Sequence, residues 1–90
     1  MKVHVKFQGI DETFEAQNAD AMLHLAKQQA AQRAPFLLRP LINSMSDLAF
    51  AAEAVKRANQ ATGRQDPIPQ SAQEFIDWGV QQGALTIIEP

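Results

Sequence analysis

The alternation of apolar and polar residues at the start of the chain limits most strongly what this sequence can fold into. Across residues 1–8, Met, Val and Phe occupy the odd positions, while Lys, His and Gln occupy the even ones. This period of two predicts a β-strand with one buried face. Alternation resumes across residues 12–17 after Gly9, which predicts a hairpin with a loop of about three to five residues. Because a two-stranded hairpin is marginal alone, a third strand has to join it.

The C-terminus provides the candidate for that third strand. Residues 84–89 read Ala-Leu-Thr-Ile-Ile-Glu and follow Gly83, a residue that commonly ends a helix. The run of large apolar side chains predicts burial on both faces of the sheet. We expect this strand beside the first one and parallel to it, which makes the sheet mixed.

The segment after the hairpin predicts a helix and then a break. Asn18 is a good N-cap, and Pro35 should end the helix at about residue 33. Between Pro35 and Pro40 the chain reads Phe-Leu-Leu-Arg, which is strongly apolar but unsuited to a regular helix because of the two prolines. We therefore expect residues 36–38 to form a buried connector.

A second, alanine-rich helix is predicted to continue to about Thr62, with Gly63 as the residue that ends it. Its start is open from the sequence alone. Pro40 can be its first residue, since proline lacks only an N–H that is unbonded there. Alternatively, Ser44 or Ser46 caps a helix that begins at the following aspartate.

The third helix has the clearest local signal. Ser71 and Glu74 form the serine–glutamate spacing of a capping box, and apolar residues follow at helical spacing until Gly83. Together these elements predict one α+β domain over residues 1–90, in the order ββαααβ. We expect a small three-stranded mixed sheet, built from the β-hairpin and the C-terminal strand, with about three helices packed on one face.

Composition excludes several classes of site. The 90 residues are 46% hydrophobic and contain no cysteine, which rules out disulfides, thiolate zinc ligands and a cysteine nucleophile. The two histidines, His4 and His24, have no metal-ligand spacing, and the glycines form no phosphate-binding loop. We therefore assign no catalytic, cofactor-binding or metal-ligating residue, and we do not expect an enzyme. The first residues lack the basic patch and apolar run of a signal peptide, and no uncharged stretch is long enough to span a bilayer, so we expect a cytoplasmic protein without a membrane partner.

Charge is unevenly distributed along the chain. The middle of the sequence is basic, whereas residues 66–90 contain only acidic charges. A single basic face would suit nucleic acid, and neutralisation between the two parts of one domain is the simpler interpretation. The candidate basic patch, within a possible nucleic-acid-binding segment 27–64, consists of Arg33, Arg39, Lys56, Arg57 and Arg64.

The single tryptophan is the most suggestive residue for partner binding. Trp78 is predicted at the edge of the buried arc of its helix, with Glu74 and Gln82 one turn away on either side. Covering the edge of a small core is the simpler role for it. The leading hypothesis is a small protein–protein interaction or accessory module that forms a homodimer or binds another protein. The alternatives are a nucleic-acid-associated regulator, and a small ligand binder or enzyme whose site is assembled only in the fold.

Overall fold

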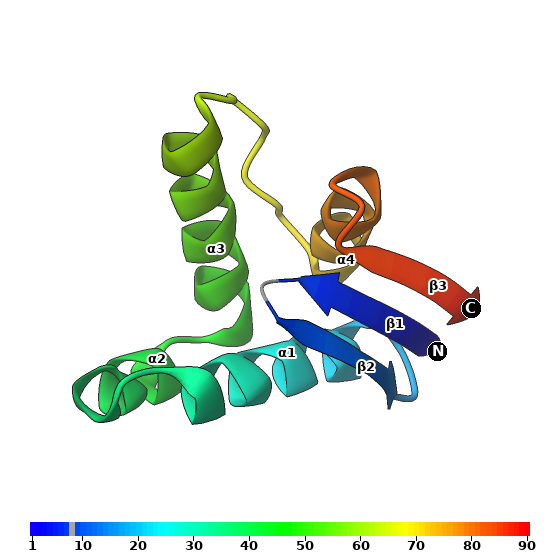
Figure 1. The fold of residues 1–90 in the computed structure, drawn as a ribbon, viewed down its shortest axis with the longest axis horizontal. Coiled ribbons are helices and arrows are strands. Elements are labelled where there is room, and N and C mark those ends of the chain that lie inside the picture. The colour runs from blue at the N-terminus through cyan, green and yellow to red at the C-terminus, as the bar shows by residue number, and fades with distance from the viewer. Residues whose placement is uncertain (8) are drawn as a thin grey trace.

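The computed structural model describes residues 1–7 and 9–90, and this part of the chain forms three strands and four α-helices (Figure 1). The expected outward position of Gln8 lies outside the described residues. In chain order the elements are β1 (Lys2–Phe7), β2 (Ile10–Glu15), α1 (Ala19–Arg33), the 3₁₀ turn η1 (Phe36–Leu38), α2 (Arg39–Ser44), α3 (Asp47–Thr62), α4 (Ala72–Gln81) and β3 (Leu85–Glu89). The α+β class and the ββαααβ order are confirmed, with the second expected helix divided into α2 and α3.

The sheet has the strand order β2-β1-β3 and is antiparallel throughout. The third strand does lie beside the first, but the expected mixed sheet is wrong. Only residues 82–84 connect α4 to β3, and the chain therefore enters β3 at the C-terminal end of β1. There Lys6 N donates to Ala84 O, and Val5 pairs with Leu85. A parallel strand would have had to start at the opposite end of β1.

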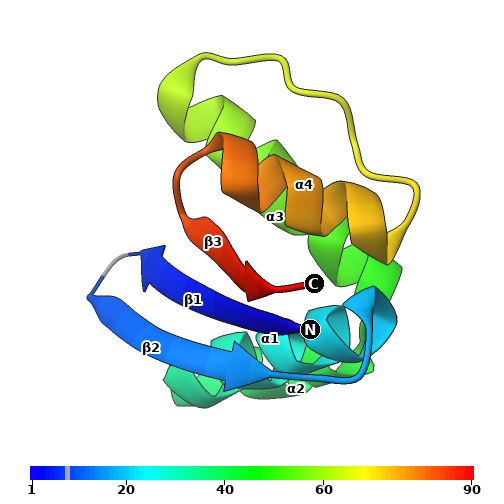
Figure 2. The ribbon, with the colours of Figure 1, turned by 90° about the vertical axis from the view of Figure 1, so that its right-hand side faces the viewer.

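The core lies between one face of the sheet and two of the helices. Val3 on β1, Met22 on α1 and Ile76 on α4 form a buried apolar cluster. A second cluster, behind the first, joins Leu23 of α1 to α3 and α4. α1 and α4 therefore cover the sheet, α2 lies against α1, and α3 rises away from the sheet, as Figures 1 and 2 show.

The helix starts follow the local capping signals. Asn18 accepts from Ala21 N at 2.9 Å and caps α1. Ser46 caps α3 by accepting from Ala49 N at 3.1 Å, which confirms one of the two alternatives for that helix. Ser71 accepts from Glu74 N at 3.2 Å at the start of α4. These bonds form between residues three apart, so they do not depend on the rest of the fold.

The segment between the two prolines differs from the sequence prediction. Residues 36–38 form the turn η1, and all three side chains are exposed rather than buried. Pro35 has an extended backbone (φ −54°, ψ 146°), which turns the chain away from the end of α1. The short helix α2 then packs back on α1, and its half-buried residue is Ile42. This contact leaves η1 on the outside of the bend.

The expected burial of β3 on both faces is also wrong. β3 is an edge strand, and only Leu85 is substantially covered. Leu85 packs on α4 at Gly79, whereas Ile87 and Ile88 are exposed. Ile88 is the extra residue in the irregularity opposite Lys2 and Val3. The apolar run reflects burial at one end of the strand only.

Candidate functional site

Trp78 is half-buried and belongs to a line of aromatic rings. Its ring stacks on Phe75 with centroids 5.9 Å apart, and Phe75 meets Phe50 of α3 edge-on at 6.3 Å. The indole N–H of Trp78 donates to Asp66 Oδ2 at 3.1 Å. A ring with one apolar face and a bonded N–H is well suited to covering the edge of a core.

Asp66 connects this ring to the loop that follows α3. Gln82 donates to the same oxygen, Oδ2, at 3.3 Å, and Arg64 donates to Gln82 Oε1 at 2.9 Å. Asn59 bonds both the backbone N–H and the C=O of Asp66, at 3.1 and 3.0 Å. The cluster therefore ties the loop to α3 and to α4. Asp66 was not singled out in the sequence, because nothing local shows that it meets Trp78.

The structure brings two of the three predicted partner-binding residues together. Trp78 and Gln82 share Asp66, as expected of residues one helical turn apart. The carboxylate of Glu74 instead accepts from Gln70 N at 3.2 Å, at the beginning of α4. Each of the three side chains makes a bond within the molecule, and a partner-binding role for them stays a prediction.

The predicted basic residues lie on several elements. Arg33 ends α1 and Arg39 begins α2, whereas Lys56, Arg57 and Arg64 lie on or beyond the second half of α3, a helix about 24 Å long. Three of the arginines also form ion pairs, namely Arg33 with Glu12, Arg57 with Glu53 and Arg64 with Asp66. Arg33 and Arg39 lie at the two ends of the turn between α1 and α2, on other elements than the remaining three.

A polar cluster joins α1 to the start of α3. The side chain of Lys27 is nearly buried, lies 3.1 Å from Asp47 Oδ1 and donates to Met45 O at 2.8 Å. His24 Nδ1 lies 3.1 and 3.2 Å from the two carboxylate oxygens of Asp47. Because an ionised carboxylate only accepts, this nitrogen has to carry the proton. The cluster fixes the position of α3 relative to α1.

The pKa of Asp47 is lowered from its ordinary value. Partial burial by itself raises the pKa of this carboxyl, but hydrogen bonds and charge from His24 and Lys27 outweigh that effect. A carboxyl with a lowered pKa stabilises the fold above the pKa of the unfolded chain, about 3.9. That stabilisation is lost as the pH falls through the lower pKa of the folded state.

The variant Asp47→Asn should therefore have a lower free energy of unfolding than the parent protein above about pH 4. This difference should shrink as the pH falls further and Asp47 of the parent becomes protonated. The measurement is urea unfolding of both proteins between pH 7 and pH 3. Taking the difference between them removes the contribution of other carboxyls that titrate in the same range. A difference in unfolding free energy that stays constant over this range would show that Asp47 has no such role.

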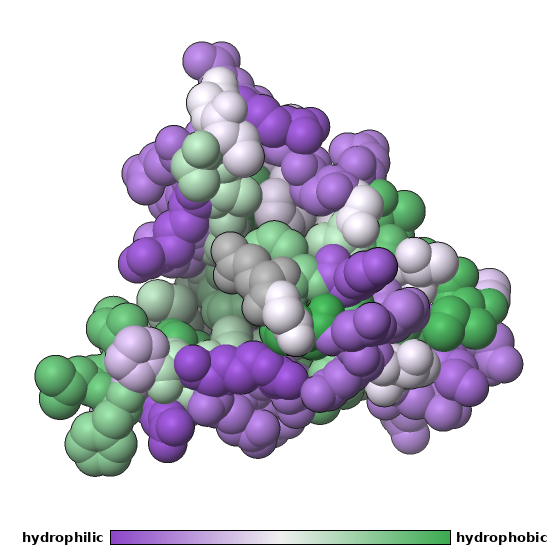
Figure 3. Space-filling view, in the orientation of Figure 1, coloured by the Kyte–Doolittle hydropathy of each residue, from purple (hydrophilic) through white to green (hydrophobic). Residues whose placement is uncertain are grey.

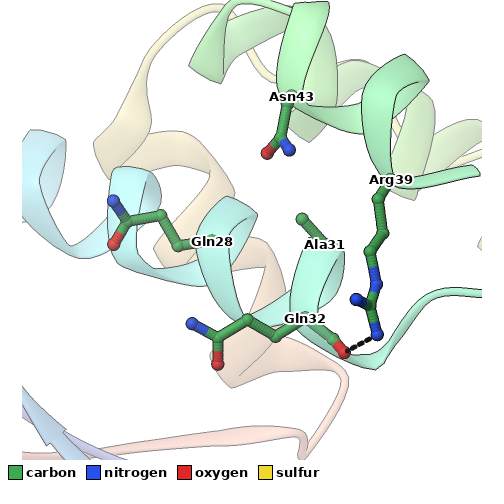
Figure 4. Close-up of a pocket in the computed structure, with 5 residues that line it drawn as sticks. All are labelled: Gln28, Ala31, Gln32, Arg39 and Asn43. Carbon is green, nitrogen blue, oxygen red and sulfur yellow. Dashed lines mark hydrogen bonds between the residues drawn. The ribbon is translucent and has the colours of Figure 1, made fainter. Parts of the chain in front are cut away.

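A shallow hollow of about 360 Å³ lies between α1 and α2 and is lined by Gln28, Ala31, Gln32, Arg39 and Asn43 (Figure 4). The guanidinium of Arg39 is already bonded there to Gln32 O at 3.3 Å, as the dashed line marks, and to Ala34 O at 3.4 Å. Arg39 thus bonds the last carbonyls of α1, a structural role.

Among residues 1–7 and 9–90, no three His, Asp or Glu side chains come together in a way that could hold a metal ion. Within the same residues, no helix has both the length and the apolar character needed to cross a bilayer.

The most unusual surface is the apolar corner, defined here as Phe36, Leu37, Leu38 and Leu41. The residue exposures of Phe36 and Leu37 reach 79% and 85%, and Leu38 and Leu41 are exposed as well. The corner forms the green projection at the lower left of Figure 3, over η1 and α2. In the sequence, the signal that residues 36–38 lie apart from the core was the pair of prolines, Pro35 and Pro40, that flank them.

No protein-family model, curated protein or solved structure matches this chain. The apolar corner exposes four large apolar residues within six positions, and contiguous exposed apolar patches on proteins commonly mark contact sites.

Proposed function

We propose that this chain is a protein–protein interaction module that self-associates, and that the apolar corner is the surface it uses. The exposure of the corner supports this proposal. Four large apolar side chains within six residues, Phe36 to Leu41, face solvent on a projecting bend. Burying such side chains against a partner is favourable by roughly 25 cal/mol for each Å² removed from water.

The sheet edges are weaker candidates for self-association. The edge formed by β2 carries three carboxylates, Asp11, Glu12 and Glu15, which would repel one another if two copies of β2 paired. The edge formed by β3 is irregular at Ile88, and such a bulge interrupts pairing with a further strand. The alanine-rich helix α3 already uses Ala51 and Val55 inside the molecule.

The test compares the mass of the parent protein with that of Leu37→Gln over a wide concentration range. Analytical ultracentrifugation should show concentration-dependent association of the parent and a monomeric Leu37→Gln. Because Leu37 is almost fully exposed, this variant should unfold with unchanged free energy. The matched control is Leu48→Gln, which changes an exposed leucine of α3 outside the corner and should still associate. A parent protein that stays monomeric at millimolar concentration would overturn the proposal.

A further inference from the structure

We infer that the apolar corner of one copy docks on a particular surface of a second copy, formed by α4 and β3. This C-terminal surface consists of Asp77, Val80, Ile87, Ile88 and Glu89. The inference rests on the proposed self-association and adds to it the identity of the receiving surface and the geometry of the assembly.

The corner lies in a positively charged stretch of the chain. From residue 21 to residue 46 there is no Asp or Glu, and the charged residues are Lys27, Arg33 and Arg39. Arg39 follows residues 36–38 directly, whereas Arg33 precedes them by three positions and pairs with Glu12. A corner-to-corner contact would therefore bring the Arg39 side chains of both copies together, which opposes association. A surface with carboxylates around exposed apolar residues is the better complement.

The C-terminal surface has that composition. Val80, Ile87 and Ile88 are exposed by 40%, 38% and 49%. Asp77 lies one helical turn before Val80 on α4, and Glu89 follows Ile88 on β3. α4 and β3 lie side by side in Figures 1 and 2.

The charge of this surface is not neutralised within the molecule. From residue 65 to residue 90 the chain contains no Lys, Arg or His. Across residues 1–7 and 9–90, the ion pairs of the structure include neither Asp77 nor Glu89. The basic middle and the acidic end of the chain meet in a single ion pair, Arg64 with Asp66. Asp77 and Glu89 are therefore available to a cation of a second copy.

The positions of the two surfaces favour a closed dimer. The corner and β3 lie toward opposite ends of the longest axis, which measures 34 Å, and both ends appear green in the single view of Figure 3. Two copies placed antiparallel along this axis would bring each corner to the other copy's C-terminal surface. A stable dimer buries on the order of 1,200–2,000 Å² in total. One corner alone is small for that, whereas two equivalent contacts double the area and saturate both surfaces.

The experiment mixes two variants that are each defective on one surface. Leu37→Asp places a carboxylate on the corner, and Ile88→Asp adds one to the C-terminal surface. Each variant alone should dissociate at least about 100-fold more readily than the parent, since every dimer contains the change twice. Equal mixing should give a heterodimer, detected by native mass spectrometry, that is weaker than the parent dimer and stronger than either variant homodimer, because it keeps one unaltered contact where each homodimer has none. A mixture of Leu37→Asp with Leu38→Asp, both altered at the corner, is the matched control and should stay monomeric.

The other outcomes are distinct. An Ile88→Asp variant that dimerises as well as the parent, with no heterodimer on mixing, would show a corner-to-corner contact and overturn the inference while leaving self-association intact. A parent protein that forms an unlimited series of masses would overturn the closed arrangement. A monomeric parent that sediments with anionic vesicles through Leu37 would overturn both proposals. If circular dichroism shows that Ile88→Asp does not fold, Asp77→Lys replaces it. The Asp77→Lys protein, measured by itself, should dimerise more weakly than the parent.

Discussion

Replacing Trp78 with Ala is expected to destabilise the protein by about 2–4 kcal/mol, below the range of about 3–5 kcal/mol for buried aromatic residues because Trp78 is only half-buried. The change removes the stacking on Phe75 and the N–H that Asp66 accepts. It thereby loosens the loop that Asp66 holds between α3 and α4. Urea unfolding followed by circular dichroism measures the loss.

Trp78→Phe is the control that separates the two contributions. A phenyl ring keeps the contact with Phe75 but lacks the indole N–H, so a loss of about 1 kcal/mol is expected. Asp66 retains its bonds from Gln82 and Arg64 in this variant. If Trp78→Ala left stability unchanged but abolished association, Trp78 would be an anchor for a partner rather than a structural residue.

Replacing Gly79 with Ala is expected to cost about 1–3 kcal/mol, although alanine is the better helix former by about 1 kcal/mol. A Cβ at residue 79 would lie 2.8 Å from Leu85 Cγ and closer still to Cδ1. The backbone of Gly79 is ordinary helix, so the cost comes from this contact alone. Either Leu85 moves or β3 shifts away from α4.

The double variant Gly79→Ala with Leu85→Ala tests that cause. Leu85→Ala alone should destabilise by leaving a gap on α4, and the two changes together should cost less than the sum of the single ones. Urea unfolding of the four proteins gives the coupling. Gln81→Ala, on the exposed side of the same helix, should stay within about 0.5 kcal/mol of the parent protein. Strictly additive effects of Gly79 and Leu85 would contradict the contact.

The partner-binding candidates illustrate how much of a site can be inferred from sequence. Trp78 and Gln82 were expected to be neighbours because they are four residues apart on a helix, and they share a bonding partner. That partner, Asp66, comes from a loop, and its position depends on bonds to Asn59. Residues 36–38 were predicted to be buried and are exposed, because an apolar composition does not tell whether a neighbouring element covers them.

The sequence by itself determined the local elements of this protein. The alternation around Val3 and Val5, the caps Asn18 and Ser71 and the break at Pro35 each depend on backbone geometry and bonds within a few residues. Only the tertiary structure decided the direction of β3, the exposure of residues 36–38 and the contact of Leu85 with Gly79. These features depend on which distant parts of the chain come into contact. The same apolar run can lie in a core, on an edge strand or at the contact with a partner.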